Sequence, residues 1–446
     1  METEVLETTC CVVGGGPAGI MLGYLLARKG IQVIVLEKHQ DFFRDFRGDT
    51  VHPSTLEVLK ELGLLEEFLD LPHQEVTSLG VFLGDSFFDV ADFRHVPLAS
   101  KFVALMPQWD FLNFLSSHAK RFPSFQLLMH HEATGLIREG EQIAGVVAKS
   151  EGRMIEIRAD LVVGSDGRHS ITRNAAGLRM IEHGVPIDVL WFRLSRKADD
   201  PAQVLGTVNY GKALILISRS DYFQAGLIIR KGSYEEIKAR GLEALRREIG
   251  QIAPYLGDRV DELHDWAQIQ ILTVQIDRLR RWYLPGLLCI GDAAHAMSPA
   301  GGVGINLAIQ DAIATANLLA KPLQERSLAV SNLAAVQRRR EFPTRLTQSV
   351  QLFAHRGLAR VFETPGPIRA PWQVKVATRI PGIHHALGYA VGVGARPEHV
   401  REEAQSRPRP LRVATAIVAG IGIVAAAAAL SLAAWKTWNR VTDAAR

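Results

Sequence analysis

The stretch VVGGGPAGIMLGYLLARKG at residues 12–30, followed by QVIVLEK at residues 32–38, decides how this chain folds. A short apolar run at residues 8–13 precedes the glycines, and apolar residues then recur at helical spacing as far as Arg28. Short β-branched runs bounded by glycine are typical of buried strands, and the longer periodic run is typical of a helix. The N-terminus is therefore predicted to form a strand–helix–strand unit with parallel strands.

The glycines of this unit follow the spacing Gly14-x-Gly16-x-x-Gly19. The first allows a tight turn, the second lets the backbone approach a pyrophosphate, and the third lets helix and strand pack closely. The start of the helix offers free N–H groups to phosphates. Glu37, at the end of the second strand, is placed to accept hydrogen bonds from a ribose. The pattern predicts dinucleotide binding and leaves FAD and NAD as alternatives.

Two later stretches combine glycine and aspartate after an apolar strand. VVGSDGRHSITRNAAG, residues 162–177, contains Asp166, which could equally be the cap of a strand-to-helix turn. GDAAHAMSPAGGVGINLAIQDA, residues 291–312, has Asp292 at the end of a strand, where ligands of open α/β sheets bind. Each stretch alone is also compatible with a purely structural turn.

In this order and at these separations, the three motifs resemble those of the group A flavoprotein monooxygenases, the family of para-hydroxybenzoate hydroxylase, over roughly residues 8–320. The resemblance implies bound FAD and a set of cofactor-contacting residues, most of them within the motifs: Gly14, Gly16, Pro17, Ala18, Gly19, Glu37, Lys38, Arg47, Gln108, Asp166, Gly291, Asp292, Pro299, Gly302, Val303, Gly304, Ile305 and Asn306. It implies no metal.

The resemblance also implies roles. The glycine motif and Glu37 would hold the ADP half of FAD; Arg47, with Arg44 as a competitor, and Gln108 would contact the cofactor; Asp166 would lie between FAD and a nicotinamide cofactor; and Asp292 would bind the ribityl chain.

The loop at residues 299–306 is expected to surround the flavin ring. Its glycines would let main-chain N–H groups approach a flat ring, and the helix that follows would direct its positive end at the charge of reduced flavin. Pro299 would shape the face on which dioxygen reacts, and Asn306 could hydrogen-bond the ring edge. Val303 departs from the family, in which glutamine is common, so only a main-chain contact would survive there.

Residues that activate the substrate cannot be matched to this sequence, so the catalytic residues stay unknown. The polar and aromatic candidates in the β-rich block are interpreted as packed sheet residues: Trp191, Arg193, Tyr210 and Tyr222. His295 is interpreted as a packing or cofactor-adjacent residue.

The predicted fold class is α/β, a Rossmann-like FAD-binding domain with an inserted β-rich substrate domain, a helical C-terminal region and a C-terminal transmembrane helix. The predicted FAD-binding segments are 1–74, 101–182 and 279–345; the substrate-domain segments are 75–100 and 183–278; the helical region is 346–400; and the anchor is 413–435.

The segment 413–435 contains no charged residue. As a helix at about 1.5 Å per residue, it would exceed the ~30 Å hydrocarbon core of a bilayer. Basic residues flank it on both sides, and Trp435 and Trp438 stand where interfacial aromatics belong. A buried or disordered alanine-rich tail is the alternative. Because the N-terminus does not resemble a signal peptide, we expect the main part of the chain on the cytoplasmic face of a membrane, held by this single anchor.

Composition narrows the classes of function. The formal net charge of +4 is small for 446 residues, and no basic cluster predicts a nucleic-acid partner. The three cysteines have no metal-ligand spacing and fit a reducing compartment.

The sequence therefore predicts an FAD-dependent, NAD(P)H-consuming monooxygenase. By the resemblance, it would use dioxygen through a flavin hydroperoxide to hydroxylate a hydrophobic aromatic, quinone-like or isoprenoid substrate. The alternatives are an FAD-dependent reductase or epoxidase of membrane lipids, and a non-catalytic membrane-anchored flavoprotein. Halogenation is disfavoured because the Trp-x-Trp-x-Ile-Pro segment of flavin halogenases is missing.

Overall fold

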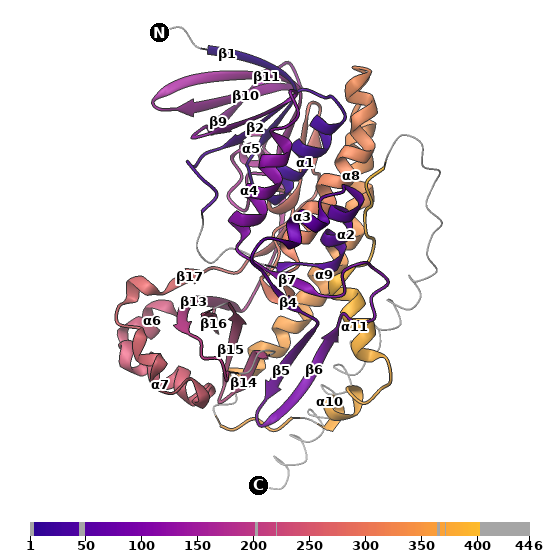
Figure 1. Ribbon diagram of the computed structural model, residues 1–446. Helices are drawn as coiled ribbons and strands as arrows, with labels where there is room; N and C mark the ends of the chain where they lie inside the picture. Colours follow the sequence, from indigo (N-terminus) through magenta and orange to yellow (C-terminus); the bar gives the residue numbers. More distant parts are fainter. Residues whose placement is uncertain are drawn as a thin grey trace, which may run out of the picture.

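The computed structural model describes residues 4–43, 50–200, 204–219, 221–363, 366–370 and 372–401. Two large sheets dominate this part of the chain (Figure 1). The upper sheet is packed against α1, α4 and α8, and the lower one lies beside α6 and α7 (Figure 1). The long helix α9 runs between these two regions (Figure 1).

The first sheet has eight strands, with the order β19-β20-β11-β1-β2-β8 and with β10 and β9 added beyond β11. Its strands are β1 (Glu4–Val13), β2 (Val33–Glu37), β8 (Phe125–Met129), β9 (Glu132–Glu139), β10 (Gln142–Ser150), β11 (Arg153–Gly164), β19 (Tyr283–Leu284) and β20 (Leu287–Cys289). The central strands β20, β11, β1, β2 and β8 are parallel. This arrangement confirms the predicted α/β class of the fold.

The side chains at the end of β1 are apolar on both faces of the first sheet, and each face is covered by other parts of the chain. Successive side chains of a strand point to opposite faces. Cys10 and Val12 join the core formed with α1 (Pro17–Arg28), α4 (Gln108–Ala119) and α8 (Gly304–Gln324). Cys11 and Val13 join a second core, formed with β9 and β10. All three cysteines are buried and free.

Smaller elements complete this region. They are α2 (Pro53–Glu61), α3 (Leu65–Leu69), α5 (Ile171–Ala175), the sheet β3 (Thr50–Val51), β7 (Val103–Leu105) and β4 (Gln74–Val76), and the pair β12 (Met180–His183) and β18 (Ile276–Leu279). Short 3₁₀ turns occur at η3 (Gly291–Ala293) and η4 (Ala300–Gly302).

The second sheet has seven strands in the order β17-β13-β16-β15-β14-β5-β6. They are β5 (Ser78–Leu83), β6 (Ser86–Asp92), β13 (Ile187–Ser195), β14 (Val204–Asn209), β15 (Lys212–Ser218), β16 (Tyr222–Arg230) and β17 (Gln270–Leu272). Two distant segments are joined because β14 pairs with β5 in parallel. One face packs on α6 (Tyr234–Ala239), α7 (Leu242–Ile252), η1 (Pro254–Glu262) and η2 (Trp266–Gln268).

The other face of the second sheet contacts α9 (Val330–Val361) and the residue after it, through Leu352, Leu358 and Phe362. The chain continues into α10 (Trp372–Ala377) and α11 (Ile383–Gly392), which packs on β6. The predicted substrate-domain segments 75–100 and 183–278 both contribute strands to this sheet. Their boundaries as domains stay a prediction.

The predicted anchor at 413–435 lies outside the described residues. Within the described part, one helix, Ala300–Gln324, is long and apolar enough to cross a membrane. In the apolar 18-residue window of this helix, 72% of the residues are buried inside the molecule, so its composition reflects the protein core.

Candidate active site

The sequence motifs meet along one edge of the first sheet. The pairing registers place Leu36, Val13, Gly164 and Cys289 in one row across the parallel strands β2, β1, β11 and β20. Each strand ends at this row or one residue later, so Glu37, the glycine motif, the segment with Asp166 and the segment with Asp292 leave the sheet side by side. The carboxyl edge of a parallel sheet is where such folds bind ligands.

Two glycines of the first motif are required by packing. Gly14 has φ +104°, and a Cβ there would lie 2.5 Å from the carbonyl oxygen of Ser165. A Cβ on Gly19 would lie 1.9 Å from the carbonyl oxygen of Gly14. These contacts bring β1, α1 and the segment after β11 close together.

Gly16 differs from these two, because a Cβ there would meet no atom of the described chain within 4 Å. Gly16 is the N-cap of α1, and no side chain caps this helix start. Pro17 and Ala18 form its first turn, in which no side chain caps the N–H groups. The space at Gly16 and those donors fit a pyrophosphate.

Glu37 is the last residue of β2. Its Oε2 accepts from the N–H of Gly15 at 3.1 Å, and its Oε1 accepts from the N–H of His39 at 3.1 Å. These bonds hold the carboxylate beside the glycine turn. Lys38 is exposed next to it. Arg47 and its competitor Arg44 lie outside the described residues.

Asp166 caps the turn into α5. Its carboxylate accepts from Ser170 Oγ at 2.6 Å, from Thr172 Oγ1 at 2.8 Å and from the Thr172 N–H at 3.1 Å. These contacts are those of a residue that caps a strand-to-helix turn, which is the structural role considered for Asp166 above. Gln108, the first residue of α4, is half-buried.

Asp292 is joined to the Asp166 segment by an arginine. Arg168 Nε donates to Asp292 Oδ2 at 3.1 Å, and Arg168 Nη2 donates to the Met297 carbonyl at 3.1 Å. The two charged side chains are 22% and 31% exposed, so the pair is accessible to a ligand. Gly291, with φ +58°, packs its Cα side against Ala18 and α8.

The glycine-rich loop is attached to the segment before α2. Thr50 Oγ1 donates to the Gly302 carbonyl at 2.8 Å, and Gly302 has φ +62°. Asn306 Oδ1 accepts from Thr55 Oγ1 at 2.6 Å and from the His52 N–H at 3.1 Å. Asn306 therefore binds protein partners through its side-chain oxygen, and its contact with a ring edge stays a prediction.

The remaining loop residues lead directly into α8. Pro299 and Val303 are half-buried, Ile305 is buried, and α8 begins at Gly304 with no side-chain cap.

Helix α9 supports the same loop from behind. Gln351 Nε2 donates to the carbonyls of Ser298 and Ala300 at 3.0 and 2.9 Å. Ser298 Oγ lies 2.8 Å from His355 Nε2. Burial lowers the pKa of His355 to about 4, which keeps this ring neutral at physiological pH. The loop is thus held by uncharged partners.

A buried charge network lies beneath it. Asp311 on α8 accepts from His295 Nε2 at 2.6 Å, from Arg340 Nε at 2.9 Å and from the Gly291 N–H at 3.1 Å. All three side chains are at most 1% exposed. His295 is therefore a buried packing residue bound to Asp311, which is one of the two roles expected for it.

These observations fit FAD. The open helix start at Gly16 suits the pyrophosphate, Glu37 suits a ribose, the accessible Asp292 suits a polyol, and the uncapped start of α8 suits a ring that carries negative charge.

Comparisons with known proteins agree. A family model described as an FAD binding domain matches residues 7–350. The 6-methylpretetramide 4-monooxygenase of Streptomyces rimosus is 31% identical over 409 residues, which cover 91% of this chain and 97% of that protein. The chain belongs to the family of FAD-dependent monooxygenases. It is an enzyme of the oxidoreductase class.

Other relatives of this monooxygenase match over less of their length. The rifampicin monooxygenase of Streptomyces venezuelae is 26% identical, over 68% of this chain and 61% of that protein. Among solved structures, the OxyS anhydrotetracycline hydroxylase of Streptomyces rimosus has TM-score 0.69 and 20% identity, over 90% of this chain and 78% of that one. PqsL of Pseudomonas aeruginosa, in complex with 2-aminobenzoylacetate, has TM-score 0.67 and 22% identity, over 80% and 100%. These structures show the fold.

Sequence reasoning missed several residues of the monooxygenase site. Arg168 stands two residues after Asp166 inside a quoted motif, so its position was a usable signal. Thr50, His52 and His355 had no such signal, because each contacts the loop only through the fold.

Proposed function

We propose that this monooxygenase uses FAD and NAD(P)H to hydroxylate a hydrophobic aromatic, quinone-like or isoprenoid compound. The observation that carries the proposal is the single row of Leu36, Val13, Gly164 and Cys289, from which all the cofactor motifs leave the sheet. When bound, FAD supplies the exchange of electrons between a nicotinamide and dioxygen.

The chain's own residues bind and orient. The N–H groups after Gly16 would donate hydrogen bonds to the pyrophosphate. The Glu37 carboxylate, which now accepts from the Gly15 N–H, would also accept from the hydroxyl groups of a ribose. Arg168 holds the Asp292 carboxylate at the ribityl position. The main chain at residues 301–304 and the start of α8 would lie beside the flavin ring and would stabilise negative charge on it.

The substrate class is supported by relatives and by the second sheet. The relative named above acts, by its name, on 6-methylpretetramide, and a Bacillus subtilis relative is named an aromatic compound monooxygenase. The sheet face that packs on α9 carries Trp191, whose ring lies over Gly226. The indole N–H of Trp191 is buried and has no partner among the described residues. A donor on an apolar face fits a substrate with few polar groups.

Helix α9 relates this face to the loop. Gln351 binds the loop at Ser298 and Ala300, and the next residue, Leu352, packs against the sheet face. We place the substrate between the loop and this face, with α9 as the wall that excludes water.

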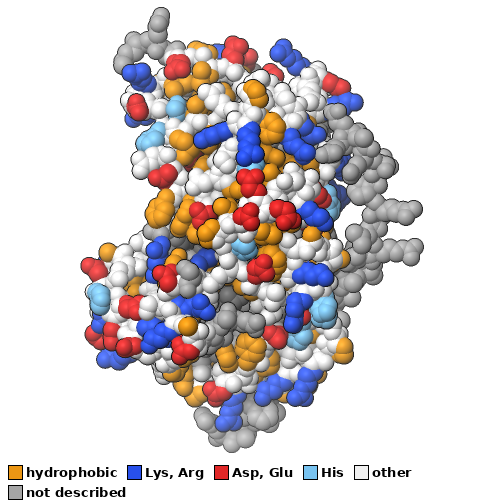
Figure 2. All heavy atoms as spheres, viewed as in Figure 1, with side chains coloured by type: hydrophobic (Ala, Val, Ile, Leu, Met, Phe, Trp, Pro, Cys, Tyr) orange, Lys and Arg blue, Asp and Glu red, His pale blue; other side chains and the backbone are white. Residues whose placement is uncertain are grey.

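We also propose attachment to a membrane through the segment 413–435, with the enzyme on the cytoplasmic face. A partly apolar surface supports it. Phe87 and Val90 on β6 are 43% and 39% exposed, and Trp372 and Val376 on α10 are 67% and 52% exposed. Figure 2 shows hydrophobic side chains over β5 and β6, with Lys and Arg side chains beside them. Exposed apolar and basic residues together suit an anionic lipid interface.

The test begins with the purified full chain and its flavin spectrum. NADH and NADPH oxidation is then measured with a panel of phenols, quinones and isoprenoids, and the product is analysed after reaction under ¹⁸O₂. Substrate-stimulated oxidation with one ¹⁸O atom in the product supports the proposal. Reduction of the substrate without oxygen would favour the reductase alternative, and oxidation that no substrate stimulates would favour the non-catalytic one.

The membrane proposal has a separate test. A variant that lacks 413–435 should keep its activity on soluble phenols and lose activity on lipophilic substrates in vesicles. If the full chain and the deletion variant both act on soluble phenols and neither acts on lipophilic compounds, the proposal of a lipophilic substrate is wrong.

A further inference from the structure

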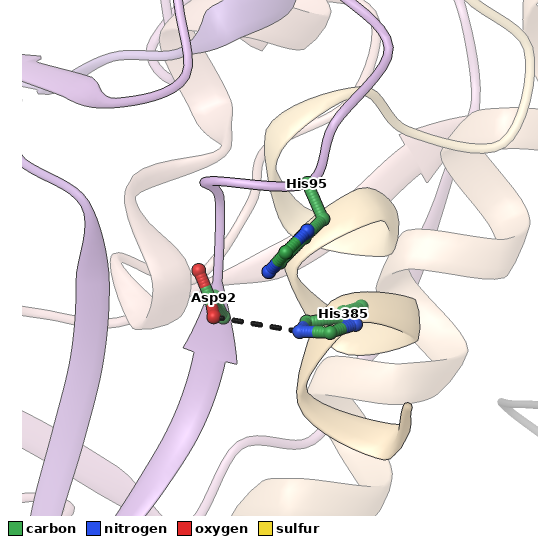
Figure 3. Close-up of side chains that lie close together, drawn as sticks. All are labelled: Asp92, His95 and His385. Carbon is green, nitrogen blue, oxygen red and sulfur yellow. Dashed lines mark ion pairs between the residues drawn. The ribbon is translucent and has the colours of Figure 1, made fainter. Parts of the chain in front are cut away.

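We propose that Asp92, His95 and His385 form a binding site for a divalent transition-metal ion of the Zn²⁺ type. Asp92 ends β6, His95 follows it in the next loop, and His385 comes from α11. Figure 3 shows the two imidazole rings beside each other and next to the carboxylate. The site is separate from the cofactor motifs and does not depend on the proposed substrate.

The distances are short enough for one ion. One ligand atom from each of the three residues lies within 4.8 Å of the other two. Asp92 Oδ2 is 3.6 Å from His385 Nε2, and the ring centroids of His95 and His385 are 3.8 Å apart. Zn–N bonds of about 2.0–2.1 Å place tetrahedral ligand atoms about 3.3 Å apart. Rotation of two exposed side chains therefore suffices to close the site.

The chemistry of the three ligands selects the class of ion. Two imidazoles and one carboxylate suit Zn²⁺ and neighbouring divalent ions, whereas Ca²⁺ and Mg²⁺ prefer oxygen alone. Asp92 supplies the oxygen ligand, because its Oδ2 lies on the side of the His385 ring, 3.6 Å from Nε2. Among the described residues, the His95 ring makes no hydrogen bond, and it packs against another imidazole.

Arg94 is the competitor of the metal. Its Nε and Nη2 donate to the two oxygens of Asp92 at 3.0 and 2.9 Å. The Arg94 side chain is 63% exposed, so it can turn away, and each carboxylate oxygen has a second lone pair for a metal. Removing this arginine should therefore strengthen metal binding.

The backbone around the site is fixed before any ion binds. A Cβ on Gly388 would lie 1.9 Å from the Asp92 carbonyl oxygen, so α11 rests directly on the end of β6. Phe93, between two of the ligands in the chain, is fully buried and packs against Gly392. A metal at this point would fasten α11 to the second sheet.

Fastening α11 has a consequence for the cofactor loop. His52 Nδ1 donates to the Val391 carbonyl of α11 at 2.8 Å, and the His52 N–H donates to Asn306. The ion would thus support, through α11, a residue that positions the start of α8.

The experiment uses untagged, metal-free holoenzyme titrated with Zn²⁺ by calorimetry, and with Co²⁺ by absorption spectroscopy. We expect one ion per chain in each titration and a rise in the unfolding temperature with Zn²⁺. His95→Ala and His385→Ala should each weaken Zn²⁺ binding at least tenfold. His264→Ala, which removes an exposed histidine between η1 and η2, is the matched control and should bind as the wild type does.

The Arg94→Gln variant should bind Zn²⁺ several-fold more tightly than the wild type. A gain in affinity cannot result from misfolding, so this variant complements the two alanine variants, in which binding is lost. Hydrogen exchange of residues 383–392 should slow when Zn²⁺ is added to the wild type and should not change in His385→Ala. Zn²⁺ binding of the same stoichiometry and affinity in wild type, His95→Ala and His385→Ala would overturn the proposal, as would no binding by the wild type.

Discussion

Arg168 and Asp292, which are 124 residues apart in the chain, form an ion pair with Nε 3.1 Å from Oδ2. The pair joins the segments after β11 and β20, and Arg168 also binds the Met297 carbonyl at 3.1 Å. One guanidinium thereby fixes both the carboxylate expected at the ribityl chain and the start of the glycine-rich loop.

Arg168→Ala should weaken FAD binding without unfolding the protein. Loss of a partly exposed pair costs on the order of 1 kcal/mol, or about fivefold in Kd. Arg168→Lys should recover only part of it, because an ammonium group cannot bind both partners in the planar geometry of a guanidinium. Titration of the apoprotein with FAD, followed by flavin fluorescence, measures this.

The matched control is Arg158→Ala on β11, which removes an exposed pair with Glu139. It should bind FAD as the wild type does. An unchanged Kd in Arg168→Ala would show that Asp292 needs no positioning by this arginine.

Gly16→Ala and Gly19→Ala should separate binding from folding. The new methyl group at residue 16 enters open space, so the unfolding temperature of the apoprotein should hold while FAD affinity falls at least tenfold through obstruction of the pyrophosphate. The methyl group at residue 19 meets the Gly14 carbonyl at 1.9 Å and should cost about 1–3 kcal/mol of stability or more. Thermal unfolding and FAD titration test both variants. If Gly16→Ala binds FAD as tightly as the wild type, Gly16 does not lie at the pyrophosphate-binding site.

The parts of the fold that could be predicted from the sequence are those that depend on short-range sequence patterns. The strand–helix–strand unit and α8 depend on hydrophobic period and glycine spacing, which act over a few residues. The row of Val13, Gly164 and Cys289 follows once the motif strands are taken as parallel neighbours. The family resemblance is confirmed by the comparisons.

Long-range contacts could not be predicted in the same way. The side-chain oxygen of Asn306 accepts from Thr55 and from the N–H of His52, both more than 250 positions earlier in the chain. The parallel pairing of β14 with β5 and the support of the loop by Gln351 likewise depend on the packing of distant segments. No local period encodes such contacts.

Asp311→Asn should destabilise the enzyme strongly. Burial alone would raise the pKa of Asp311, but His295 and Arg340 outweigh it and lower the pKa overall. The substitution removes one carboxylate from buried Arg340, which keeps Glu398 at 3.4 Å, so the loss of charged hydrogen bonds costs about 1.5–3 kcal/mol. Urea unfolding at neutral pH measures the loss. Glu325→Gln, in an exposed pair with Lys321 near the end of the same helix, is the control and should cost at most about 0.5 kcal/mol. Equal small effects of the two substitutions would contradict the structural role of the network.

His355 should make the stability of the enzyme sensitive to mild acid. Burial lowers the pKa of His355 in the folded protein from 6.5 to about 4. Between pH 6.5 and 4 this ring is therefore protonated in the unfolded chain and neutral in the folded protein, which favours unfolding. Its contribution is constant above pH 6.5 and decreases as pH falls from 6.5 to 4, by up to about 3 kcal/mol at 1.36 kcal/mol per pKa unit. His52, with a pKa also lowered to about 4 by burial, adds a second contribution of the same sign.

His355→Asn should therefore flatten the decrease in unfolding free energy between pH 6.5 and 4, while it lowers stability at pH 7 through the altered contact with Ser298. Denaturant unfolding at a series of pH values compares the slopes. The control His264→Asn replaces an exposed ring far from Ser298 and should keep the wild-type slope. A His355→Asn slope equal to that of the wild type would mean that this ring is charged in the folded enzyme, and the loop at Ser298 would then be held by an ion rather than by a neutral imidazole.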